Sequence, residues 1–281
     1  MEDRFFTGTK VRSPVVEGIF YPEDGESMGE TIGSWNLALG KGREGGRAQA
    51  ILAPHAAWQI SGRIAGIAFE AAAGRARGIQ QVLILGPIHR RSFTGLYLSE
   101  SGFFKTPLGN IPVDRGLSEE LASRDALFRI DDVPHLMEHS LEVLLPLVKY
   151  CFPWARIVPV LMGGPSRPLI SALGGALRSV FESRLEHTLI VVSANLGQNR
   201  DDQSALNEAE TALELLENSD YQGYIRGVTE GGFRACGCAL TAGLLESGLL
   251  NNRRVRFLSS PLIKILGEMD DLGYLGALAF E

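Results

Sequence analysis

Two apolar segments of similar design constrain the fold of this 281-residue chain more than any other feature. The run Ile51–Ala53 leads into His55 through a proline, and the run Leu83–Leu85 leads into His89 through Gly-Pro-Ile. Each run is typical of a buried strand that delivers one imidazole just beyond its C-terminal end. Because ligands of open α/β sheets bind at the carboxyl edge of the strands, the pattern indicates a site that holds both histidines.

Strand-like and helix-like segments alternate along the rest of the chain, which predicts an α/β fold. We expect a single domain over residues 1–281, with a central, largely parallel or mixed sheet flanked by helices. The expected strands are 48–53, 81–85, 94–99, 156–162, 188–193, 254–259 and 273–280. The expected helices are 61–75 with Ser61 as its cap, 117–123, 140–150 with a kink at Pro146, 168–184, 203–217 and 239–247, and segment 103–113 is expected to be a loop or an irregular hairpin.

Composition narrows the classes of partner and cofactor. The net charge of -6 argues against binding to nucleic acid or to an anionic membrane, and no apolar run reaches the roughly 18 residues of a membrane span. Three cysteines, Cys151, Cys236 and Cys238, do not form a disulfide framework, so a reducing cytoplasm is expected. Neither Gly163-Gly164 nor Gly231-Gly232 belongs to a phosphate-loop motif, so no nucleotide cofactor is expected, and serine-hydrolase chemistry is not expected either.

Further reactive side chains follow other predicted elements. A third apolar strand ends at Ser193, followed by Asn195 and Gln198, and Cys236 precedes a predicted helix, where backbone N–H groups lower a thiol pKa. A thiolate and two neutral imidazoles form a reasonable set of ligands for zinc, copper or iron. The alternative is that both histidines bond to backbone in loops and that Cys236 is a small buried residue.

Two other features allow competing interpretations. The segment His135–Glu142 contains H-x-x-E-H, a zinc-peptidase pattern that needs a helix to place His135 and His139 on one face, with Glu138 as base. Alternatively, its acidic residues begin a helix and His139 caps it or lines a pocket. Trp58 lies near His55 in sequence and either walls an aromatic pocket or packs in the core.

Short motifs from one end of the chain to the other resemble those of the Memo-like family. In chain order they are 12–22 (R-S-P to E-G-I-F-Y-P), 53–62 (A-P-H-A-A-W to S-G), 85–89 (L-G-P-I-H), 106–114 (T-P-L-G to V-D), 138–146 (E-H-S-L-E to L-P), 236–237 (C-G) and 273–274 (G-Y). The resemblance implies a fold related to class III, LigB-type, extradiol dioxygenases. It also implies a metal pocket whose ligands here are His55, His89 and Cys236.

The chain departs from that family where the family carries S-S-D-x-x-H. On an ungapped placement Ala194 replaces the aspartate, and Gly197 replaces the histidine expected to transfer protons or to join the metal site. His139 can take over proton transfer only if it faces the pocket, whereas Asn195 and Gln198 can only hydrogen-bond.

The sequence therefore favours two functions about equally. One is a metal-dependent oxidoreductase of unknown substrate that uses iron, copper or zinc, and the other is a noncatalytic ligand- or peptide-binding scaffold that kept the fold. A zinc peptidase is a minor alternative. We expect a small-molecule or peptide ligand and, by default, a homodimer. The expected pocket residues are Trp58, Glu142, Ser193, Asn195 and Gln198, with His139 as the catalytic residue.

Overall fold

The computed structural model describes residues 10–39, 47–90, 92–259, 262–266 and 272–281. Within these residues the largest sheet has eight strands in the order β11-β14-β2-β9-β3-β8-β4-β7. In chain order they are β2 (Ala50–Ala53), β3 (Gln81–Pro87), β4 (Gly95–Leu98), β7 (Phe128–Ile130), β8 (Arg156–Gly163), β9 (Thr188–Ser193), β11 (Val255–Phe257) and β14 (Leu278–Phe280). The inner strands β2, β9, β3 and β8 are parallel, and β14 and β4 run antiparallel to them on either side. The predicted α/β fold with a mixed sheet is therefore confirmed.

Two smaller sheets lie beside the large one. They are β1 (Val11–Arg12) with β5 (Phe103–Phe104) and β6 (Ile111–Pro112), and β10 (Gly197–Asn199) with β12 (Ile263–Leu266) and β13 (Leu272–Leu275). The irregular hairpin expected at 103–113 is the antiparallel pair β5 and β6. The single strand expected at 273–280 is wrong, because the chain leaves the ladder at Gly276 and Ala277 and passes from β13 in one sheet to β14 in another.

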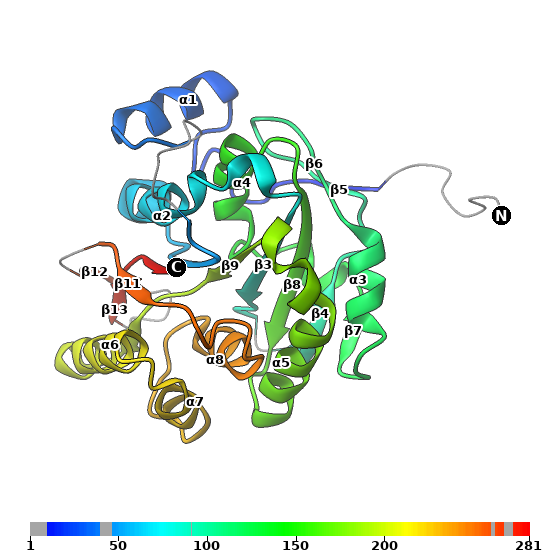
Figure 1. The fold of residues 1–281 in the computed structure, drawn as a ribbon. Coiled ribbons are helices and arrows are strands. Elements are labelled where there is room, and N and C mark those ends of the chain that lie inside the picture. The colour runs from blue at the N-terminus through cyan, green and yellow to red at the C-terminus, as the bar shows by residue number, and fades with distance from the viewer. Residues whose placement is uncertain (1–9, 40–46, 91, 260–261, 267–271) are drawn as a thin grey trace.

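Helices cover both faces of the central sheet (Figure 1). They are α1 (Gly25–Ser34), α2 (Trp58–Ala73), α3 (Arg115–Ala122), α4 (Leu145–Cys151), α5 (Arg167–Phe181), α6 (Asp202–Glu217), α7 (Tyr221–Thr229) and α8 (Cys238–Glu246). The core under α1, α2 and α4 takes Val82 and Ile84 from β3, whereas the core under α5 to α8 takes Leu83 and Leu85. Burial on both faces explains why the inner strands are continuous apolar runs.

Two predicted helix boundaries are wrong, for reasons of local chemistry. Helix α2 begins at Trp58, and Ser61 lies inside it with its hydroxyl donated to the Ala56 carbonyl, so Ser61 is not the cap. Pro146 does not kink a longer helix, because it lies in the first turn of α4, where its missing N–H has no partner to lose. No helix in the described part of the chain is long and apolar enough to cross a membrane.

A buried ion pair fastens the N-terminal segment to the segment that follows β7. Arg12 and Glu142 are 4% and 2% exposed and form an ion pair. Arg12 also donates to the carbonyls of His135 (3.1 Å) and Glu138 (2.7 Å). The Glu142 carboxylate accepts the Tyr21 hydroxyl at 2.8 Å and two backbone N–H groups near it. Glu142 is thus a buried structural anchor, and it is not among the residues that line the two cavities beside the candidate ligands.

We predict that Arg12→Met destabilises the fold by about 3–5 kcal/mol, because it leaves the Glu142 carboxylate buried without its cation. Urea unfolding followed by circular dichroism measures this free energy. The exposed Arg178, paired only to its helical neighbour Glu182, supplies the control. Arg178→Met should change stability by about 0.5 kcal/mol or less. Equal stabilities for the two variants would contradict the anchoring role.

Candidate metal site

The carboxyl ends of β2 and β3 deliver two imidazoles to one place. Both strands are parallel to β9, which lies between them, and His55 and His89 each follow two residues after their strand. Their ring centroids are 5.2 Å apart. Cys236 joins them from the loop between α7 and α8, so that one ligand atom from each of the three residues lies within 4.8 Å of the others.

A glycine allows the cysteine loop to approach the end of β9. Gly237 has φ 85°, and a Cβ on it would collide with the Ser193 carbonyl and lie 2.5 Å from the Cβ of Ala194. Helix α8 therefore begins at Cys238, two residues later than the thiol that faces the histidines. Cys236 thus precedes the helix, as the sequence predicts, and does not lie in its first turn. That place belongs to Cys238, where burial raises the thiol pKa to about 12.

Hydrogen bonds determine which ring nitrogen of His55 is available to bind a metal. Ser193 Oγ lies 2.7 Å from the Ser140 carbonyl and 2.8 Å from His55 Nδ1. A carbonyl only accepts, so the serine donates its proton there and accepts the Nδ1 proton of His55. The lone pair of His55 is then on Nε2. Burial, followed by repulsion from His89 and His139, holds the pKa of His55 well below its usual value, which keeps the ring neutral.

His89 is oriented by a carboxylate instead. Its Nδ1 lies 2.9 Å from Glu138 Oε1, and its backbone N–H donates to Oε2 at 2.8 Å. Although burial opposes the ionised form, the hydrogen bonds from His89 hold the pKa of Glu138 at about 2. Burial also works against protonation of His89, but its bonds with Cys236 and Glu138 outweigh that effect and raise its pKa to about 10. Nδ1 therefore donates to Glu138 and Nε2 is left to Cys236, and a metal ion would bind Nε2 in place of its proton.

A second group of possible ligands, His89, Glu138 and His139, shares one member with the first. Its carboxylate is already engaged, because Glu138 also accepts the backbone N–H groups of His139 (2.9 Å) and Ser140 (2.8 Å). With four N–H donors on two oxygens, a metal there would have to displace existing bonds. The group formed by His55, His89 and Cys236 contains no carboxylate engaged in this way, and a metal there would displace only the weaker hydrogen bonds of the Cys236 thiol with Gln198 and His89.

A buried carboxylate on α6 connects the two loops that meet at Cys236. Glu208 accepts the backbone N–H groups of Arg234 (2.5 Å) and Ala235 (2.7 Å) through one oxygen, and that of Gln198 (3.3 Å) through the other. Gln198 in turn accepts the Cys236 thiol at 3.0 Å. Burial outweighs these bonds and raises the pKa of Glu208. Sequence reasoning did not assign this role, since nothing marks Glu208 among the other acids of an amphipathic helix.

The structure contradicts the peptidase geometry of H-x-x-E-H. A short 3-10 helix, Val133–His135, ends at the first histidine, and residues 136–139 are not helical. His135 is buried against Phe104, with Nε2 3.2 Å from the Tyr97 carbonyl, and burial lowers its pKa to about 4. It belongs to none of the metal-capable groups among the described residues. Only His139 of this pair faces His55 and His89, at ring-centroid distances of 6.1 and 4.7 Å.

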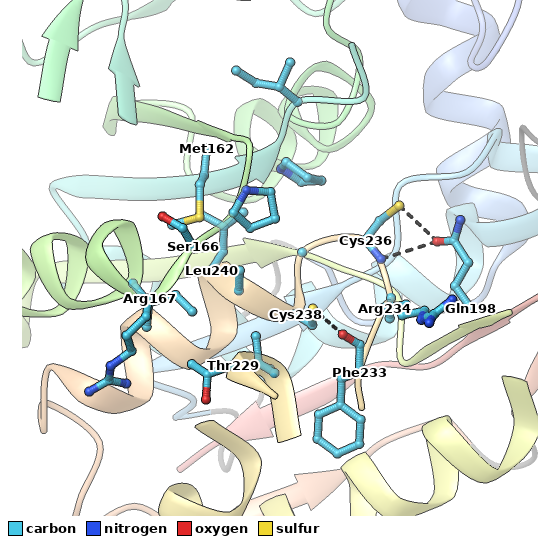
Figure 2. A pocket seen from close by; sticks show the side chains of 18 of the residues that line it. Met162, Ser166, Arg167, Gln198, Thr229, Phe233, Arg234, Cys236, Cys238 and Leu240 are labelled. Atoms are coloured by element: carbon cyan, nitrogen blue, oxygen red, sulfur yellow. Dashed lines mark hydrogen bonds between the residues drawn. The ribbon is translucent and has the colours of Figure 1, made fainter. Parts of the chain in front are cut away.

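Two cavities meet at the candidate ligands. The larger, of about 480 Å³, lies toward α5 and α8, and the smaller, of about 220 Å³, lies on the side of His55 and His139. Both are lined by His89, Gln198 and Cys236. Figure 2 shows the Cys236 thiol turned toward the Gln198 amide at one end of the larger cavity. A ligand in either cavity would therefore reach the same three side chains.

The predicted pocket residues divide into two kinds. Asn195 and Gln198 line the smaller cavity, and the buried Oδ1 of Asn195 has no hydrogen-bond partner among the described residues. Ser193 is buried behind His55 and acts on the site only through its hydrogen bond. Trp58 takes the core alternative: it packs on Trp35, donates to a backbone carbonyl and lines neither of the two cavities.

Gly197, which stands where the related motif has histidine, has no room for any side chain. A Cβ there would collide with the Ala205 carbonyl and lie 2.9 Å from the Cβ of Ala209, both on α6. A side chain at residue 197 would therefore point into helix α6 and away from the cavities. The next residue, Gln198, supplies the side chain that lines them.

Comparisons of the sequence with protein families and with individual proteins point to the same family. Residues 12–261 match the family described as Memo-like protein. A MEMO1 family protein of Thermotoga neapolitana is 29% identical over 95% of this chain and 99% of its own length. One of Methanobrevibacter smithii is 30% identical over 81% of this chain and 83% of its own. Among solved structures, an uncharacterized protein of Escherichia coli K12 aligns over 82% of this chain and 98% of its own, with a TM-score of 0.47 and 11% identity.

We predict that Gly197→Ala destabilises the protein by about 1–3 kcal/mol, because the added methyl group overpacks the contact with α6. Thermal and urea unfolding measure the change. Gly175→Ala is the matched control, since an added Cβ on this exposed residue of α5 meets nothing within 4 Å. The control should stabilise the helix by about 0.5–1 kcal/mol. A stability of Gly197→Ala equal to that of the unaltered protein would show that the position has room for a side chain.

Proposed function

The chain belongs to the Memo-like family, and from this premise we propose that it binds a divalent transition metal ion through His55, His89 and Cys236. One observation carries the proposal. The three donor atoms converge within 4.8 Å, while the other ring nitrogen of each histidine is held by an oxygen atom of Ser193 or Glu138. Metal-binding imidazoles are oriented in this way by hydrogen bonds to their second nitrogen.

The donor set fits some metals better than others. One thiolate and two imidazoles suit zinc, copper or iron, whereas magnesium and calcium prefer oxygen ligands. Three protein ligands leave a position open. A metal with an open position supplies Lewis-acid activation and, if it is iron or copper, electron transfer.

We further propose that the protein is a metal-dependent oxidoreductase in which His139 transfers protons. His139 lines the smaller cavity with His55, and its ring is stacked on that of His89. A substrate group in this cavity would lie between His139 and Asn195, whose free carbonyl oxygen can accept one hydrogen bond. No imidazole can be provided from residue 197, so His139 is the histidine that remains for this task.

The absence of a side chain at Gly197 also favours a second function. A protein that kept the fold and the cavities but lost that histidine and the neighbouring aspartate, now Ala194, can bind a small ligand or a peptide without turning it over. The two functions differ in one measurable property. Metal-loaded protein that consumes oxygen or oxidises a screened substrate, and loses this activity in His139→Gln, is an enzyme.

We predict that the protein, purified anaerobically without a His tag and reconstituted with zinc, iron or copper, holds close to one metal ion per chain. His55→Ala and Cys236→Ser should each lose most of it, because a two-ligand site binds weakly. Mass spectrometry of the metal content measures this. His187→Ala is the control, since the imidazole of this exposed histidine contacts the Gly78 carbonyl and belongs to neither metal-capable group among the described residues. Wild-type protein that holds no metal after reconstitution would exclude the proposed site.

Glu138 provides a second test, because it orients His89 without being a proposed ligand. We predict that Glu138→Gln weakens metal affinity about 10- to 100-fold, since the amide presents N–H groups where the carboxylate accepted them. Competition with a chromophoric chelator measures the affinity. The control is Glu120→Gln on α3, whose carboxylate pairs only with surface arginines. An affinity unchanged by Glu138→Gln would mean that this carboxylate does not orient the ligand.

A further inference from the structure

The larger cavity has the dimensions and the lining of a small-molecule site. Its volume of about 480 Å³ falls in the range of pockets that enclose drug-sized ligands. Its walls come from the ends of β3 and β8, from α5 and α8, and from the segment after α7. Most of the lining is apolar, with Ile88, Met162, Ile170, Val228, Phe233 and Leu240 supplying the largest side chains.

The permanently charged side chains on this lining are arginines. No aspartate or glutamate is among the described residues that line the cavity, although the chain as a whole carries a net charge of -6. Two arginines, Arg167 and Arg234, lie at opposite ends of it (Figure 2). A cavity of this charge in an acidic protein selects for an anion.

The two arginines differ in whether an acidic side chain already pairs with them. Arg167 is paired with Glu246, at 2.8 and 3.1 Å, so its charge is largely neutralised. Arg234 is exposed, and no hydrogen bond joins its guanidinium to a residue that the structure describes, although its charge partly offsets the rise that burial causes in the pKa of the nearby Glu208. The amide nitrogen of Gln198 is likewise without a partner among the described residues, whereas its amide oxygen accepts from Cys236. Arg234 and Gln198 both face the end of the cavity that contains Cys236.

Two other polar side chains of the lining already have partners. Thr229 donates to the Ile225 carbonyl, and the Cys238 thiol donates to the Phe233 carbonyl at 3.7 Å. At the end of the cavity away from Cys236, Arg167 is held by Glu246 and Ser166 is the remaining polar side chain. An acidic group would therefore bind beside Cys236, where Arg234 and Gln198 both present donors.

We propose that the larger cavity binds a small organic monoanion, with its acidic group at Arg234 and Gln198 and its apolar body between α5 and α8. This binding does not require a metal. That the molecule is the substrate of the metal site rests on the function proposed above, because its acidic end would lie next to Cys236 and His89.

The test compares two fluorescent probes that differ by one anionic group. They are 1-anilinonaphthalene-8-sulfonate and its neutral parent, N-phenyl-1-naphthylamine, and each is titrated into metal-free protein. We expect one sulfonate probe to bind per chain. Arg234→Met should weaken it roughly tenfold, the size of a lost charge-assisted hydrogen bond, and should change binding of the neutral probe less than twofold. The matched control, Arg226→Met on the exposed side of α7, should change neither.

A second variant locates the bound probe. Val228→Trp fills the cavity from α7 and should abolish binding of both probes, with folding verified by circular dichroism. Sulfonate binding that is unaffected by Arg234→Met, or that persists in folded Val228→Trp protein, would overturn the proposal. Metal content of the same proteins separates the two hypotheses. Metal binding without probe binding overturns only the anion site, and probe binding without metal binding overturns only the metal site.

Discussion

The parallel register of β2, β9 and β3 is the constraint on which the candidate site depends. Ala53 pairs with Ser193, and Leu85 pairs with Val192, so that the three strands reach the same edge of the sheet at nearly the same height. His55, Ser193 and His89 are separated by as many as 138 residues in sequence, yet they meet because their strands end together. The continuous burial of these strands on both faces fixes that register, since a slip of one residue would exchange the two cores.

Buried hydrogen bonds then fix the orientation of the side chains that the strands bring together. Ser193 and Glu138 each hold Nδ1 of one histidine, and Glu208 holds the backbone of β10 at Gln198 and of the loop that leads to Cys236. The segment that carries Glu138 is itself fastened by Arg12 from the other end of the chain. A site on loops is thereby supported as firmly as one on strands or helices.

Sequence reasoning found the parts of this arrangement that leave a periodic signal. The apolar runs predicted the inner strands, and the rule for strand ends placed His55 and His89 together. Sequence patterns did not predict the positions of residues that are set by tertiary contacts. Trp58 and Glu142 are of residue types that often line pockets. Here Trp58 packs on Trp35 and Glu142 pairs with Arg12, so both are buried away from the two cavities. The function of Glu208, and the lack of space at Gly197, depend on how α6 lies against β10, which no local pattern records.

The central claim is that two imidazoles and one thiolate of this chain form a single metal site. X-ray absorption at the zinc edge, on protein loaded with one equivalent of zinc, tests the ligand set itself. The account predicts one sulfur at about 2.3 Å and two imidazole nitrogens at about 2.0–2.1 Å, with the sulfur lost in Cys236→Ser. A first shell of nitrogen and oxygen alone in the unaltered protein would contradict it, because the thiol would then have no part in binding.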